Sequence, residues 1–268
     1  MAERDDLDNQ AILSAFTPLS KPRPGAVETL LHPRRRAHDD DPLTEATHAQ
    51  LFADAHAEDL RYNHKRGVWL FYEPPIWRPD RDERIMREAI LFARQRQEDA
   101  LRIDNKDDRQ KAVQFAMKQE NRAGMKNIID IAKSLHPLAD TGEGWDAQNW
   151  LMGAPNGVIN LRTGLLHMGE PTDRISMSVT VPYDETDTAP KRWCSFLQEV
   201  FDGDQSLIEF VQRYLGYCLT GETTEQVLTV FHGRGANGKS TMLNTLAWSL
   251  GDYAHNMPFS TVELTQRA

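Results

Sequence analysis

One stretch near the carboxyl end of the sequence has the residue types and the spacing to hold phosphate groups. The string Gly233-Arg234-Gly235-Ala236-Asn237-Gly238-Lys239-Ser240 fits the pattern G-x-x-x-x-G-K-[ST] at every fixed position. Its three glycines let the chain curl so that successive backbone N–H groups can face phosphate oxygens. The string therefore predicts a phosphate-binding loop over 233–241.

Each polar side chain of this loop has an expected partner on a nucleoside triphosphate. Lys239, the candidate catalytic residue, would reach the β- and γ-phosphates, while the Ser240 hydroxyl would ligate Mg²⁺. Thr241 would meet the α-phosphate, and the following helix adds its partial positive charge. We expect ATP with Mg²⁺ as cofactors, held by Gly233, Arg234, Gly235, Ala236, Asn237, Gly238, Lys239, Ser240 and Thr241.

The elements around the loop follow the order that such a motif needs. The apolar, β-branched run 227–231 predicts a buried strand leading into the loop. Apolar residues then recur at helical spacing over 242–250, and Gly251 is placed to cap the end of that helix. A chance glycine turn before a helix would explain the string without chemistry, but the strand and the helix favour a nucleotide site.

Upstream of the loop the pattern alternates between helices and short strands. Thr44 is a candidate N-cap for a first helix, and strands at Leu60–Asn63 and Val68–Tyr72 flank a turn in which Gly67 suits a positive φ. The polar, charged segment 80–136 reads as helical with no breaker before Gly124, and 95–126 as a solvated helix or a mobile connection.

A β-rich segment and two amphipathic helices complete the region before the loop. Strands are predicted at 150–151, 158–161, 165–166 and 175–181, and helices from Pro190 and from Ser206. The apolar stripes of these two helices indicate core faces. The only cysteines, Cys194 and Cys218, fall in these helical patterns, so we interpret them as reduced core residues of a cytosolic protein.

The first hairpin gathers aromatic and basic residues, which leaves two interpretations open. Interleaved aromatic rings and cations can stack on and clamp single-stranded nucleic acid. The alternative, which we favour, is a small sheet that packs its rings inward. The residues concerned are Trp69, Phe71, Tyr72 and Trp77, beside Arg61, Lys65 and Arg66.

Composition limits the classes of function. The 268-residue chain carries a net charge of −9, which argues against a broadly basic nucleic-acid surface but not against local basic loops. No apolar run approaches the roughly 18 residues that a membrane span needs, and the acidic N-terminus does not have the layout of a signal peptide. Residues 1–42, with repeated prolines and runs of charge, read as a disordered tail.

Several strings together resemble the primase-helicases of phages and plasmids. They are 155–164 (PNGVINLRTG), 213–221 (RYLGYCLTG), the loop with Asn237 before Gly238, and the ending 250–253 (LGDY). The resemblance implies a poxvirus-type N-terminal domain followed by a superfamily 3 helicase core. It implies an α/β fold: a tail over 1–42, an α+β collar or adaptor domain over 44–221, and the truncated beginning of a P-loop NTPase domain over 222–268.

The same resemblance implies a function. Members of this family are hexameric, ATP-driven motors that move on DNA during replication of a phage, plasmid or integrated element, here in the cytoplasm of a bacterial host. Single-stranded DNA is the expected partner and ATP, rather than GTP, the expected nucleotide. Residues 1–42 are too short and too polar to fold as the primer-synthesising domain that relatives often carry upstream.

The sequence ends shortly after the loop helix, before the acidic strand, polar sensor and arginine finger of a superfamily 3 core. We therefore expect this chain alone to hydrolyse little or no ATP, as the N-terminal part of a longer protein or the product of a truncated gene. Two alternatives remain: a kinase built on the same loop, and a non-catalytic assembly or single-stranded DNA-binding remnant with a vestigial loop.

Overall fold

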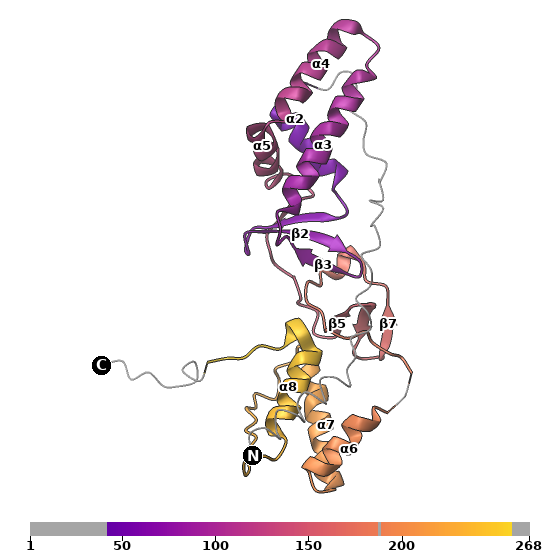
Figure 1. Ribbon diagram of the computed structural model, residues 1–268, viewed down its shortest axis with the longest axis vertical. Helices are drawn as coiled ribbons and strands as arrows, with labels where there is room; N and C mark the ends of the chain where they lie inside the picture. Colours follow the sequence, from indigo (N-terminus) through magenta and orange to yellow (C-terminus); the bar gives the residue numbers. More distant parts are fainter. Residues whose placement is uncertain (1–41, 187–188, 259–268) are drawn as a thin grey trace, which may run out of the picture.

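A computed structural model describes residues 42–186 and 189–258 of the chain. The predicted tail over 1–42 therefore lies, except for its last residue, outside the described residues. The described elements follow one another along a long axis: a helical arm, a first sheet, a second smaller sheet and a group of three helices (Figure 1). This mixture of helices and strands agrees with the predicted α/β class. Within the described ranges no helix is long and apolar enough to span a membrane.

The first sheet has four strands in the order β3-β2-β1-β4. Strands β1 (Leu60–Asn63), β2 (Val68–Glu73) and β3 (Ile76–Pro79) form an antiparallel meander, and the short β4 (Ala139–Asp140) joins β1 in parallel. The predicted hairpin is confirmed, because Gly67 has a φ of 67° in its turn. Strand β3 was not predicted: it contains Pro79, and its four residues directly follow the turn at Pro74-Pro75.

Three helices pack on this sheet, and one core holds them together. They are α2 (Glu45–Ala55), capped as predicted by the Thr44 hydroxyl, and the helices α3 (Arg84–Leu101) and α5 (Arg122–Ala132). Trp69 and Phe71 of β2 face this core, while Leu70 packs with Trp77 and Trp145 on the other face. Since Trp69, Phe71 and Trp77 are at most 6% exposed, the rings pack inward, and the stacking interpretation is wrong for these three residues.

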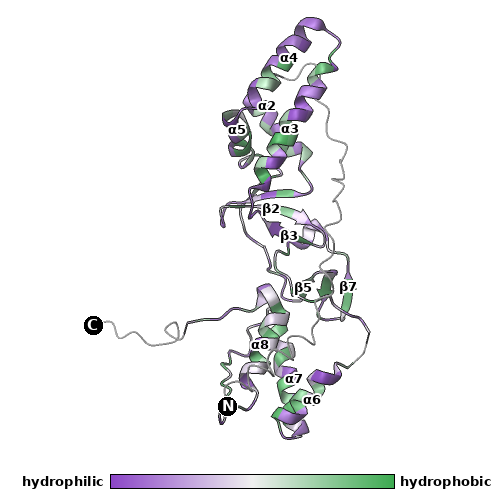
Figure 2. Cartoon of the chain, viewed as in Figure 1, coloured by the Kyte–Doolittle hydropathy of each residue, from purple (hydrophilic) through white to green (hydrophobic). Residues whose placement is uncertain are grey.

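The segment 80–136 is helical as predicted but contains breaks that the sequence analysis missed. Asn105 caps α4 (Lys106–Gln119) and Asn121 caps α5, each through a side-chain oxygen that accepts backbone N–H groups. These caps divide the segment into three helices, because an asparagine at an N-cap satisfies donors that would otherwise lack partners. Helices α3 and α4 form an arm whose outer part is mostly hydrophilic (Figure 2), as expected for a solvated helix pair.

The second sheet is a three-stranded antiparallel meander of β5 (Leu151–Ala154), β6 (Gly157–Asn160) and β7 (Leu165–His167). It follows the predicted strand positions to within a few residues. The strand predicted at 175–181 is wrong. Its backbone groups bond to separate partners: Ile175 O accepts from Trp77 N, Val179 N donates to Gly153 O, and Thr180 N donates to Ser249 O. The segment therefore runs between elements, beyond the short helix η1 (Pro171–Asp173), without following one ladder.

The three-helix group contains α6 (Lys191–Val200), α7 (Gln205–Leu219) and α8 (Lys239–Leu250), which ends in the short helix η2 (Gly251–Tyr253). A small apolar cluster joins them through Leu197, Ile208, Val211 and Met242. The helices were predicted, but the core assignment of the cysteines is wrong: Cys194 and Cys218 are both free and exposed. They fall on the sides of α6 and α7 away from this cluster.

The strand predicted at 227–231 is also wrong. These residues form no strand, and the apolar side chains Val227, Leu228 and Val230 are 60%, 82% and 74% exposed. A β-branched run needs neighbouring strands to pair its backbone and cover both its faces. No strand of the described ranges pairs with it, so only Phe231 reaches the apolar cluster of the three helices.

Candidate functional site

The predicted phosphate-binding loop lies between the extended segment 227–231 and the start of α8. Gly238 occupies the N-cap position of α8 with φ 80° and ψ −3°, and no side chain caps the helix there. A helix N-terminus without a side-chain cap is the arrangement that binds anions through its backbone N–H groups. The residues before Asn237 are exposed and those from Asn237 to Lys239 are half-buried, so an incoming ligand can reach the loop.

The three glycines of the loop differ in what the structure requires of them. A Cβ on Gly233 would lie 2.4 Å from Asn237 Nδ2, and one on Gly238 would lie 2.5 Å from Val200 Cγ2. Gly235 has open space around it and no positive φ, so the expectation that it is needed for the curl is not supported. The second left-handed residue of the loop is Ala236, with φ 58°.

Lys239 is held against the loop that it follows. Its Nζ donates to Asn237 Oδ1 at 2.6 Å and to the carbonyl oxygens of Gly233 and Arg234 at 3.3 Å each. The ammonium therefore sits inside the curl of the loop, surrounded by neutral oxygens. Charged phosphate oxygens are stronger acceptors than these neutral groups. Asn237 makes the shortest of the three contacts to the ammonium.

Helix α6 packs against the end of the loop at Gly238. Gly238 is within contact distance of Val200 and Phe196, both on α6, and Met242 in the first turn of α8 is fully buried in the cluster formed with α7. Packing of this kind fixes the start of α8 relative to the rest of the helical group. The loop is thereby built on a rigid element, as a site for a highly charged ligand requires.

The far end of α8 is fastened to the second sheet and to 175–180. The Tyr253 hydroxyl accepts from Gly153 N at 2.8 Å and donates to Met177 O at 3.2 Å. Ser178 N donates to Asp252 Oδ2, and the Thr180 hydroxyl donates to Trp248 O at 2.6 Å. Burial raises the pKa of Tyr253 to about 12, so its hydroxyl keeps its proton at physiological pH.

Sequence reasoning missed this docking of Tyr253 and Asp252, although it quoted the string 250–253 as part of the family resemblance. The conformation and close contacts of Gly251 explain why a glycine stands at this position of the string. Its φ is 55°, and a Cβ there would lie 2.7 Å from Ser178 O. The predicted C-cap is confirmed, and the close approach to 178–180 gives it a second reason.

A buried carboxylate fixes the connection between the two sheets. Asp140 at the end of β4 accepts from Trp145 Nε1 at 2.9 Å and from Gly142 N, and Arg174 Nη2 lies within 3.0 Å of both its carboxylate oxygens. Burial alone would raise the pKa of Asp140, but the hydrogen bonds from Trp145, Gly142 and Arg174 outweigh it and lower the pKa below its usual value. The group stays charged and holds residues 140–146 against the strand-free segment after η1.

Residues 49–202, more than half of the chain, match the sequence pattern of the family described as "D5 N terminal like". The chain belongs to this family. The matched range covers both sheets, the helical arm and α6, and it ends before α7 and the loop. The resemblance to primase-helicases is thus confirmed for the N-terminal domain, while a superfamily 3 core stays a prediction.

Two viral proteins are similar to this chain. One, from Acanthamoeba polyphaga mimivirus and named "Putative helicase L207/L206", is 32% identical over 179 residues, which are 64% of this chain and 18% of that protein. The other, from Invertebrate iridescent virus 6 and named "Putative helicase 184R", is 24% identical over 148 residues, or 54% and 15% of the two chains. The chain thus spans less than a fifth of these relatives. A phage or plasmid origin and a bacterial host stay predictions.

Proposed function

We propose that residues 233–241 bind the triphosphate of ATP together with Mg²⁺, and that the chain is the nucleotide-binding portion of a helicase- or primase-type DNA replication protein. The observation that carries the proposal is the uncapped start of α8, where Gly238 is left-handed and the Lys239 ammonium lies inside the loop. Membership of a family whose viral relatives are named as helicases supports the same assignment.

The residues present fit a triphosphate. A phosphate group would accept hydrogen bonds from the first-turn amides of α8 and from Lys239 in place of its neutral acceptors. The exposed Ser240 would supply a hydroxyl ligand to Mg²⁺, an ion that offsets the negative charge of the β- and γ-phosphates. Within the described ranges no three His, Cys, Asp or Glu side chains gather as a metal site, so the ion would be held mainly by phosphates and water.

Domain roles follow from this assignment as proposals. Residues 44–221 serve as the collar or adaptor and 222–268 as the beginning of the ATPase domain, within a protein that works as a hexamer on single-stranded DNA. ATP hydrolysis is proposed for the whole protein, of which this chain would supply the nucleotide-binding portion.

A calorimetric titration of Mg-ATP into the chain tests the nucleotide site. Loss of a hydrogen bond to a charged group costs about 1.5–3 kcal/mol, so Lys239→Ala is expected to weaken binding by roughly 10- to 150-fold. Lys191→Ala, which removes an exposed lysine at the start of α6, is the matched control and leaves the affinity unchanged. Equal affinities of the Lys239 variant and the control would refute the proposal.

A further inference from the structure

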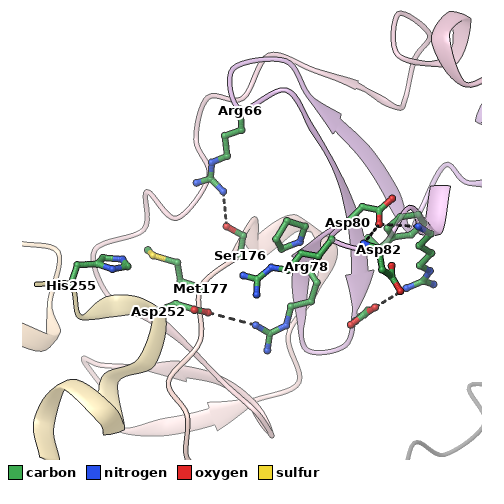
Figure 3. A pocket seen from close by; sticks show the side chains of 13 residues that line it. Arg66, Arg78, Asp80, Asp82, Ser176, Met177, Asp252 and His255 are labelled. Atoms are coloured by element: carbon green, nitrogen blue, oxygen red, sulfur yellow. Dashed lines mark hydrogen bonds and ion pairs between the residues drawn. The ribbon is translucent and has the colours of Figure 1, made fainter. Parts of the chain in front are cut away.

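A polar cavity separate from the loop lies between the first sheet and the end of α8. Its volume is about 610 Å³, and four arginines line it, Arg66 from the β1–β2 turn and Arg78, Arg81 and Arg84 from β3 and the segment leading into α3. Figure 3 shows Arg78 pointing across the cavity toward Asp252, with His255 beyond it on the segment that follows α8. The sequence analysis considered only Arg66, and it did not use Arg78, Arg81 and Arg84, although these three fall within seven residues.

The carboxylates of the cavity are already engaged. Asp80 accepts from the backbone N–H groups of Asp82, Arg84 and Ile85 at 2.9–3.2 Å, as a cap for the start of α3. These bonds, together with nearby Arg87, outweigh the effect of burial and lower the pKa of Asp80. The amides stabilise its charged form, and Asp80 makes no ion pair with an arginine of the cavity among the described residues.

The other two carboxylates of the sheet side are paired with arginines. Asp82 forms an ion pair with Arg87, which lies outside the cavity lining, at 2.9 Å. Glu73 is 2.7 Å from Arg84, which also lies 4.2 Å from the ring centre of Phe71 and pairs with Glu88. Arg84 is therefore held in place, and neither acid is left to neutralise another cation.

The guanidinium groups of Arg78 and Arg81 have weaker ion-pair interactions than those of the other two arginines. Arg81 is exposed and forms no hydrogen bond or ion pair with any residue that the structure describes. The Arg78 side chain is 41% exposed and lies 3.6 Å from Asp252, a longer contact than the other arginine pairs of this cavity. Asp252 is itself bonded to Ser178 N. Arg66, the fourth arginine, is committed to Asp146 and Ser176.

We propose that Arg78 and Arg81 bind phosphate groups of a single-stranded nucleic acid backbone in this cavity. Two cations without firm partners face a space larger than one phosphate ion fills, and guanidinium groups bind phosphate oxygens through paired N–H donors. The chain carries a net charge of −9, whereas the four arginines of this cavity offset its four carboxylates, so a polyanion meets less repulsion here than the net charge of the chain implies. The choice of nucleic acid as the source of the phosphates rests on the proposed function.

Fluorescence anisotropy of a labelled oligothymidylate of about 20 nucleotides, titrated with the whole chain at several KCl concentrations, tests this site. Removing two phosphate contacts lowers the slope of log K against log salt by about 1.4, at about 0.7 per contact with a single strand. The variant Arg78→Gln/Arg81→Gln is therefore expected to show that smaller slope and at least tenfold weaker binding at low salt. Unchanged slope and affinity would overturn the proposal.

A matched variant separates the site from overall charge. Arg94→Gln/Arg102→Gln removes an equal charge from α3 and its C-cap residue, where the two side chains are 64% and 66% exposed. It should change the affinity by less than twofold, and a loss as large as that of the cavity variant would show that only net charge matters. Asp252→Asn acts in the opposite direction: it keeps an oxygen for Ser178 N, releases Arg78, and should tighten binding several-fold.

Two further arms identify the ligand and separate this proposal from the nucleotide site. Inorganic phosphate at 10 mM, with ionic strength held constant, should displace little of the oligonucleotide, whereas full displacement would assign the cavity to a free anion. Lys239→Ala should lose Mg-ATP affinity and keep oligonucleotide affinity. If Lys239→Ala abolishes oligonucleotide binding and the cavity variant does not, the nucleic acid binds at the loop and the cavity proposal fails. Arg81→Gln alone, at an exposed side chain, keeps the test available if the double variant does not fold.

Discussion

Two glycines of one motif should respond in opposite ways to the same substitution. Gly238 has φ 80°, and a Cβ there would lie 2.5 Å from Val200 Cγ2 and 3.4 Å from the ring of Phe196. Gly235 has an ordinary φ and nothing within 4 Å of the site of a Cβ. Gly238→Ala therefore meets backbone strain and an overlap, and Gly235→Ala meets neither.

The size of the difference follows from these contacts. An alanine in the left-handed region costs roughly 1–2 kcal/mol, and forcing a methyl group into filled space costs roughly 1–3 kcal/mol. Alanine also lowers the conformational entropy of the unfolded chain, which adds roughly 0.4–1 kcal/mol to the free energy of unfolding of either variant. Gly238→Ala should thus lose about 2–4 kcal/mol of unfolding free energy, and Gly235→Ala should match the wild type or gain up to about 1 kcal/mol.

Urea unfolding followed by far-ultraviolet circular dichroism measures both variants. For a chain of this size the loss in Gly238→Ala corresponds to a fall of about 1 M in the urea midpoint. The double variant Gly238→Ala/Val200→Ala should recover about 1–3 kcal/mol relative to the sum of the single variants, because it removes the overlapping methyl group. Equal midpoints for the two glycine variants, or no coupling with Val200, would refute this account of the loop.

Three other changes test the helices beside the first sheet, the loop and the end of α8. Burial lowers the pKa of His48 to about 4, with a smaller contribution from Arg96, so the unfolded chain takes up a proton first as the pH falls. The free energy of unfolding should therefore drop by about 3 kcal/mol between pH 6.5 and pH 4. The variant His48→Leu should flatten that pH profile. Ala236→Gly relieves a φ of 58° and should raise the thermal midpoint slightly, by the equivalent of about 0.5–1 kcal/mol, whereas a fall would mean that the loop is unstrained. Tyr253→Phe leaves Gly153 N without its acceptor and should cost about 1–3 kcal/mol in urea unfolding, with no change expected if water replaces the hydroxyl.

Much of the fold could be predicted where the signal is local. Thr44, Gly67 and Gly251 each adopt the cap or turn conformation that their residue types favour, because those conformations depend on one or two neighbouring residues. The helices α6, α7 and α8 were predicted from apolar spacing for the same reason. The caps Asn105 and Asn121 carried an equally local signal, but the many charged residues around them concealed the breaks.

The failures occurred where structure depends on distant partners. The apolar run 227–231 has the composition of a strand, yet no described strand lies beside it to pair its backbone. The segment 175–181 gives its N–H groups to Asp146, Asp252, Gly153 and Ser249 in turn, and no local pattern reveals so many separate acceptors. Cys218 lies in an apolar pattern, but the face of α7 that is covered is decided by α6 and α8, whose positions the sequence did not indicate.

The candidate site shows the same division. The glycine–lysine motif identified 233–241 without any knowledge of the fold, since its chemistry resides in consecutive residues. Three other features could not be read from the motif. The contact of Asn237 with the Lys239 ammonium depends on side-chain conformation. The packing of Gly238 on Val200 and the bond from Gly153 to Tyr253 depend on residues outside the motif. Arg78 and Arg81 were missed because their significance depends on which neighbouring carboxylates are already paired.

Hydrogen exchange of the chain with and without Mg-ATP, read by mass spectrometry on peptides covering 233–243, tests the central claim most directly. If the loop and the first-turn amides of α8 hold the triphosphate, exchange in these peptides slows with Mg-ATP and stays unchanged in Lys239→Ala. Peptides from the arm helices α3 and α4 serve as the internal control and should not respond. Binding of Mg-ATP that leaves exchange at 233–243 unaltered, or protection that persists in Lys239→Ala, would contradict the account.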